Sequence, residues 1–153
     1  MAKKLTIQTT GLAAVTITRH AINREKLVYI ACANKALSYR HGRSPIVYIG
    51  TTRKGVDRIA ASAAVKAKLF LSDHGVKQLD FYVVGCAPRK KVKTWRKLER
   101  GLILEFRHMF GDPPLGNTQG LKMKWTDELN YFTRQRLESV LKKYSGNKVA
   151  ERN

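Results

Sequence analysis

The stretch Val47-Tyr48-Ile49-Gly50 organises the chain. Val, Tyr and Ile favour β-strands, and a glycine can adopt the positive φ that often ends a strand. An alanine-rich helical pattern begins a few residues later, and Arg58 stands eight residues after Gly50, in the first turns of that pattern. The sequence therefore predicts a strand over residues 46–50 that leads into a helix, with Tyr48 and Arg58 close to each other.

Hydrophobic patterns on both sides of this stretch predict further strands and helices. Apolar runs predict strands over residues 27–33 and 79–85, and one or two further strands over residues 5–19. Apolar residues at helical spacing predict helices over residues 54–71, 94–109 and 126–144, the last with Leu129 on its packing side. Residues 34–45, with Gly, Pro and Ser, are expected to form a mobile basic loop. Together these elements predict an α+β fold in one compact unit.

Composition points to an anionic partner. The 153 residues contain 30 Lys and Arg against 11 Asp and Glu, a formal net charge of +19. Such an excess of positive charge repels itself and favours a polyanion, most commonly nucleic acid. We expect no membrane partner, because no apolar run approaches the length of a bilayer span and no long basic amphipathic helix stands out. The N-terminus lacks a signal-peptide core, which predicts a cytoplasmic protein.

A group of polar residues could converge on one site. Tyr29 lies in the strand expected before that of Tyr48. Glu99 shares a helical stripe with Leu102, Ile103 and Phe106, so its carboxylate needs a metal ion or an arginine as a partner. Glu105 is the alternative acid, on another face of the same helix. Each of these signals is weak alone, since strand tyrosines usually pack and a chance acid on a helix is common.

The most basic stretch, residues 88–100, flanks Glu99. It includes Trp95, an aromatic side chain that could stack on a base or sugar. With neighbouring cations of residues 34–54, it gives the predicted nucleic-acid contacts: Arg40, Arg43, Arg53, Lys54, Arg89, Lys90, Lys91, Lys93, Trp95, Arg96 and Lys97.

The order of these motifs resembles the GIY-YIG nuclease superfamily. Apolar-apolar-Tyr is followed by Tyr-Ile-Gly, an Arg ten residues after the second Tyr, Glu-x-x-Leu-Ile on a helix, and Pro-x-x-Asn. The resemblance covers residues 27–120, with residues 1–26 as an N-terminal β extension and residues 121–153 as a C-terminal helix and tail. Leu27 stands where the name-giving glycine usually is, and the two tyrosines are unusually far apart. The resemblance implies a small three-stranded antiparallel sheet flanked by helices.

By this resemblance the catalytic residues are Tyr29, Tyr48, Arg58, Glu99 and Asn117. Glu99 would bind Mg²⁺ or Mn²⁺, and Arg58 would clamp a phosphate oxygen. One tyrosine would take the proton of the attacking water, once its pKa is lowered by Arg58 and the metal-bound water, and the residues leave open which one. The implied protein is a metal-dependent endonuclease that hydrolyses phosphodiester bonds in DNA, with RNA left open as a substrate. Cutting both strands with one active site would favour a homodimer.

Two other functions compete with this one. A non-catalytic basic protein that binds DNA or RNA would share the charge and the strand tyrosines, but would show no metal-dependent cleavage. A nuclease fold retained as an adaptor is disfavoured, because all five motif positions hold chemically competent residues.

Overall fold

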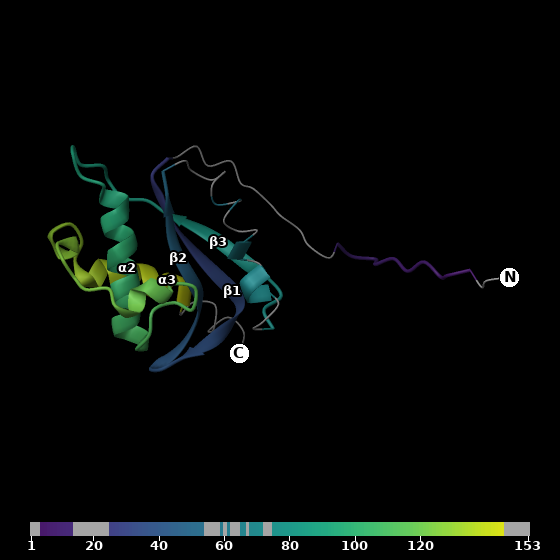
Figure 1. Ribbon diagram of the computed structural model, residues 1–153. Coiled ribbons are helices and arrows are strands. Elements are labelled where there is room, and N and C mark those ends of the chain that lie inside the picture. The colour runs from purple at the N-terminus through teal and green to yellow at the C-terminus, as the bar shows by residue number, and fades with distance from the viewer. Residues whose placement is uncertain are drawn as a thin grey trace.

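The protein has a three-stranded antiparallel sheet with helices on both faces, as expected from the sequence (Figure 1). The computed structural model describes residues 4–13, 25–53, 59, 61, 65–66, 68–71 and 75–145. Strand β1 (Leu27–Tyr39) is central and pairs with β2 (Gly42–Thr52) and β3 (Leu79–Val84). The main helices are α2 (Thr94–Phe110) and α3 (Arg134–Ser145), with short 3₁₀ helices η1 (Thr118–Leu121) and η2 (Glu128–Asn130) between them. None of the described helices is long and apolar enough to cross a bilayer.

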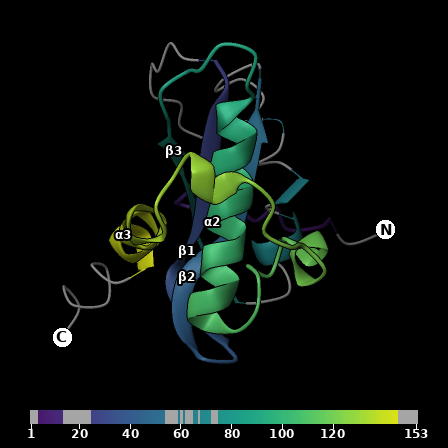
Figure 2. The ribbon, with the colours of Figure 1, turned by 90° about the vertical axis from the view of Figure 1, so that its left-hand side faces the viewer.

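The sheet separates two apolar clusters. Helices α2 and α3 cover one face, where Val28, Ile30 and Ile49 pack against Leu102 and Phe106. Figure 2 shows α2 lying along this face, beside β1 and β2. On the opposite face a smaller cluster joins Ala31, Ala33, Val47, Phe70 and Val76. Phe70 belongs to the helical residues 68–71, which pack on the second face.

The second strand carries a β-bulge just before Tyr48. Ala31 pairs with Tyr48, whereas Cys32 pairs with Ile46, so Val47 is an additional residue in β2. Bulges bend a strand and change the direction in which its side chains point. As a result Val47 and Tyr48 both belong to the second face, while Ile46 and Ile49 belong to the first.

The predicted loop over residues 34–45 is wrong. Strands β1 and β2 continue through it, and the connection is a tight turn at Arg40 and His41. Pro45 is tolerated in this position because β2 is an edge strand, where a missing N–H costs little. The long gap between the two tyrosines is therefore a hairpin extension.

Two other expectations are corrected. Residues 5–13 form no strand, and the rest of the predicted N-terminal β segment lies outside the described residues. The last helix begins at Arg134, after a cap in which the Thr133 hydroxyl accepts from the Arg136 N–H, and not at residue 126. Leu129, expected to pack, is 47% exposed.

Glu128 explains the later helix start. Its carboxylate is fully buried and accepts hydrogen bonds from the Thr126 N–H at 2.7 Å and from Arg100 Nε at 2.6 Å. Burial opposes its ionisation, but these hydrogen bonds outweigh burial and lower its pKa to about 2. The acidic residues that resemble a helix start instead form a tight turn held to α2.

Candidate active site

Tyr29 and Tyr48 lie side by side on the second face of the sheet. Tyr29 pairs with Gly50 and Tyr48 pairs with Ala31, which makes the two tyrosines diagonal neighbours on adjacent strands. Their ring centroids are 5.8 Å apart, and the rings are tilted by 42°. Tyr29 is 4% exposed, whereas Tyr48 is half-buried. The two strands thus bring together the pair of phenols that the sequence predicts.

Gly50 makes room for this pair. A methyl group added there would lie 2.5 Å from Cζ of Tyr29, 2.6 Å from its hydroxyl oxygen and 2.7 Å from Cε1 of Tyr48. Such distances are far below van der Waals contact, so only glycine fits without displacing a ring. The glycine of the Tyr-Ile-Gly stretch therefore serves the packing of the tyrosines, in addition to any role at the end of the strand.

The Tyr48 hydroxyl is held in its neutral form. Burial raises its pKa, and the neighbouring Tyr29, its hydrogen bond and the charge of Glu99 act in the same direction. The nuclease hypothesis requires a lowered pKa for the general base, whereas the pKa of Tyr48 is raised. The Arg58 expected to lower it lies outside the described residues.

Glu99 lies in the first half of α2, and its charge adds a minor contribution to the raised pKa of Tyr48. Burial raises the pKa of its carboxyl group to about 7, although Arg96 and Arg100 act to lower it. Glu105, the alternative acid, is buried on the side of α3, where Arg134 Nε donates to it at 2.9 Å. Glu105 is thus held in a salt bridge to α3, which leaves Glu99 as the candidate acid.

Asn117 supports the site from the backbone. Its side-chain oxygen accepts from the Ile49 N–H at 2.9 Å, and its Nδ2 donates to the Ile49 carbonyl at 2.7 Å. The Gly116 N–H also donates to the Val47 carbonyl at 2.8 Å. The amide thus pairs with the outer edge of β2 as another strand would, directly between Tyr48 and Gly50. The sequence predicts a catalytic role for Asn117. In the structure its side chain also joins the loop after α2 to the edge of β2.

Asn117→Asp is expected to destabilise the protein by about 1–3 kcal/mol at pH 7. A carboxylate cannot donate to the Ile49 carbonyl and would place a negative charge beside that oxygen. The free energy of unfolding in urea measures the effect, and the exposed Asn130→Asp serves as the control. Equal stability of the two variants would show that the contact with Ile49 contributes little.

One residue of the site was missed in the sequence. Lys66, on the helical segment over the second face, holds its ammonium 4.2 Å from the centre of the Tyr48 ring. The sequence could have indicated this residue, because Lys66 stands four residues before the apolar Phe70 and residues four apart share a helix face.

The predicted nucleic-acid contacts divide between two ends of the sheet (Figure 1). Arg40 and Arg43 lie at the β1–β2 hairpin, where Arg40 pairs with Asp112 and Arg43 donates to the Ala36 carbonyl. Arg43 and Arg53 are ten residues apart along β2 and the residue that follows it, which corresponds to about 30 Å in an extended strand. The hairpin pair therefore does not belong to the same surface as the other basic residues.

The opposite end, near the tyrosines, carries a dense basic surface. Its exposed members are Arg53, Arg89, Lys90, Lys91, Lys93 and Arg96. Arg89 lies over the Tyr131 ring, and Lys97 pairs with Asp127 at 2.6 Å. Trp95 is only 8% exposed, with Lys26 over its ring, so it offers no open stacking surface and the expectation of base stacking is not supported. Lys54 lies outside the described residues.

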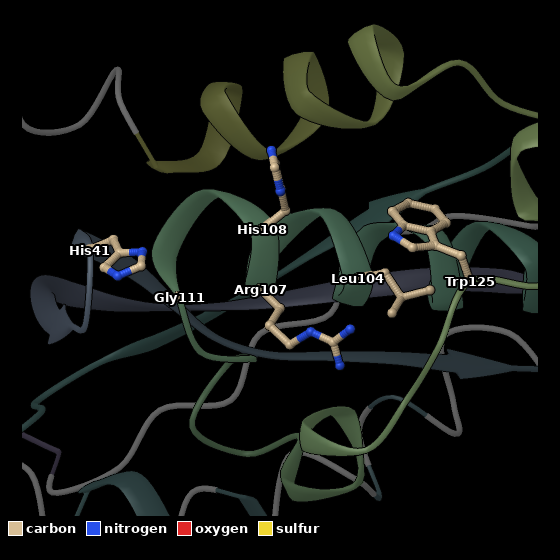
Figure 3. Close-up of a pocket in the computed structure, with 6 residues that line it drawn as sticks. All are labelled: His41, Leu104, Arg107, His108, Gly111 and Trp125. Carbon is tan, nitrogen blue, oxygen red and sulfur yellow. The ribbon is translucent and has the colours of Figure 1, made fainter.

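A hollow lies at the C-terminal end of α2. Figure 3 shows Arg107 and His108 pointing to opposite sides of the helix, with His41 apart from both. Arg107 donates to the carbonyls of Gly120 and Met123 at 2.6 and 2.7 Å, so its guanidinium holds η1 and the residues that follow it. The side chains around this hollow do not converge on a common point.

Within the part of the chain that the structure describes, no three His, Cys, Asp or Glu side chains gather into a metal-binding group. Comparisons of the chain with protein-family models, with curated proteins and with solved structures found no match.

Proposed function

We propose that this protein is a GIY-YIG-like endonuclease that uses Mg²⁺ or Mn²⁺ to hydrolyse phosphodiester bonds in DNA. The observation that carries the proposal is the pair of tyrosines packed over Gly50, with their ring centroids 5.8 Å apart. Glu99 on α2 is the candidate acid of this site, because burying an uncompensated carboxylate is unfavourable and a bound cation would offset that cost.

Glu99 is the residue that would hold the metal ion. A carboxylate oxygen is a ligand that Mg²⁺ prefers, and a pKa of about 7 lets the group ionise at neutral pH when a cation binds. A bound divalent cation would stabilise the charge that develops on the phosphate and on the departing oxygen. With one protein carboxylate, the remaining ligands would be water and substrate.

The tyrosines would orient the reacting groups. Tyr48, kept neutral, would donate a hydrogen bond to the phosphate or to the attacking water. Tyr29 then remains as the general-base candidate: as a phenolate, a form that Arg58 and a metal ion would favour, it would take the proton from water and become the neutral phenol. Arg58, expected on the helix that follows β2, would clamp a non-bridging oxygen as a permanent cation.

The basic surface at the same end of the sheet supports a nucleic-acid substrate. Arg53, Lys90, Lys91, Lys93 and Arg96 are exposed there and would neutralise backbone phosphates. As proposed, the protein acts in the cytoplasm on DNA, and a homodimer would allow both strands to be cut.

The test is cleavage of supercoiled plasmid and of labelled single-stranded DNA and RNA, with Mg²⁺, with Mn²⁺ and with EDTA. We expect cleavage with either metal and none with EDTA. Binding that weakens with salt but leads to no cleavage in any metal would instead favour the non-catalytic binding protein, a function with which the structural use of Asn117 agrees.

A further inference from the structure

Lys66 lies against the face of Tyr48. The distance of 4.2 Å from its Nζ to the ring centre is well within the range of a cation–π interaction. Lys66 and Tyr48 are both only half-buried, so the ammonium group remains accessible from solvent. A positive charge is therefore held at the open side of the tyrosine pair.

Phe70 fixes the helical segment that carries Lys66. Phe70 is 1% exposed and lies four residues after Lys66, on the same helix face. A methyl group added to Gly116 would lie 2.8 Å from Cδ2 of Tyr48 and 3.0 Å from Cζ of Phe70, so both rings meet beside Gly116. With Phe70 anchored there, Lys66 is placed one helical turn away, over Tyr48.

We propose that Lys66 binds the phosphate of the substrate strand beside the tyrosine pair, an inference that rests on the proposed nuclease function. A phosphodiester carries one negative charge, and more charge develops on its oxygens in the transition state. An ammonium on a flexible stem offers three N–H donors to such oxygens. Packing against Tyr48 limits the motion of the stem before substrate arrives, which reduces the entropy lost on binding.

Three variants separate this role from general attraction to DNA. Lys66→Met keeps a similar stem over Tyr48 without the charge, and Lys66→Arg keeps a cation. Lys68→Met is the matched control, because Lys68 is exposed on another face of the same helix. The measurements are kcat and KM with Mg²⁺ on a labelled duplex, and duplex affinity with Ca²⁺ in place of Mg²⁺.

We expect Lys66→Met to lower kcat by about 10²-fold, and Lys66→Arg to stay within about tenfold of wild type. Lys68→Met should change kcat by less than about twofold. Lys66→Met should lose more duplex affinity than Lys68→Met, because only Lys66 is placed to contact the substrate phosphate. If Lys66→Met does not fold, Lys66→Gln provides the same comparison with a polar end.

The wild-type protein distinguishes the two ways in which the inference could fail. If wild type cuts DNA and Lys66→Met has the kcat of Lys68→Met, the role of Lys66 is overturned and the nuclease function stands. If wild type cuts no substrate with either metal, the nuclease function fails and the role of Lys66 fails with it.

Discussion

Glu99→Gln is expected to abolish metal-dependent cleavage while raising the thermal stability of the protein above pH 7. Glutamine has nearly the same shape, but it supplies no negative charge to a divalent cation. The loss of this ligand should remove several kcal/mol of transition-state stabilisation, about 10³-fold or more in rate. Conversion of supercoiled plasmid at saturating Mg²⁺ measures this loss.

The stability gain follows from the raised pKa of Glu99. Its value of about 7 in the folded protein exceeds the ordinary value of 4.5, so the folded state binds more protons than the unfolded state between these values. The free energy of unfolding therefore falls as pH rises from 4.5 to 7, and the full cost, on the order of 2 kcal/mol, is present at pH 8. Because glutamine does not ionise, the variant avoids this cost.

The melting temperatures of wild type and Glu99→Gln should thus differ by about 5 °C at pH 8 and by little at pH 5. Glu138→Gln removes the same charge from the surface of α3, where Glu138 forms an i,i+4 pair with Lys142, and should change neither cleavage nor stability greatly. Normal cleavage by Glu99→Gln would remove Glu99 from the active site. A stability gain that is equal at pH 5 and pH 8 would contradict the explanation by burial.

The parts of the fold that the sequence predicted well are those with strong local patterns. Helix α2 was expected over residues 94–109 and runs from Thr94 to Phe110. Its apolar stripe marks the extent of the helix, and Gly111, which follows it, marks the end. The strand around Tyr48 was likewise expected, since β-branched residues and a glycine mark it. In both segments local preference and tertiary packing favour the same structure.

The predictions that failed concern segments whose structure is determined by contacts with residues distant in the sequence. Residues 34–45 contain turn-forming residues, yet pairing between β1 and β2 extends through them. Thr126 and Glu128 resemble a helix start, yet Arg100 of α2 holds them in a turn. The hydrogen bonds between the Asn117 amide and Ile49 likewise depend on a neighbour 68 residues away, although they do not test a catalytic role for Asn117. No local pattern in the sequence contains these partners.

Gly50→Ala is expected to damage both stability and activity, because its methyl group would occupy space that the two tyrosine rings fill. The nearest atoms, at 2.5 to 2.7 Å, belong to rings that are themselves packed, Tyr29 against Phe81 and Tyr48 against Lys66. Forcing such rings apart costs about 1–3 kcal/mol, and more where the neighbours cannot move. Thermal and urea unfolding measure this cost.

Activity should fall further than the loss of folded protein explains. A displacement of about 1 Å in a catalytic group can reduce a rate about 10²-fold, and the added methyl lies closest to the hydroxyl end of Tyr29. Cleavage should therefore be compared at a temperature where Gly50→Ala remains folded. Gly11→Ala is the matched control, since a methyl group there would meet nothing within 4 Å.

A double-mutant cycle tests whether contact with Tyr29 causes the loss of stability in Gly50→Ala. Tyr29→Leu removes the ring end that the new methyl group would touch, so Gly50→Ala should cost less in stability in that background than in wild type. Equal costs in both backgrounds would locate the effect in the backbone of β2 and not in the tyrosine pair. A Gly50→Ala protein with wild-type stability and cleavage would contradict the close packing of these rings, and with it the arrangement on which the proposed active site depends.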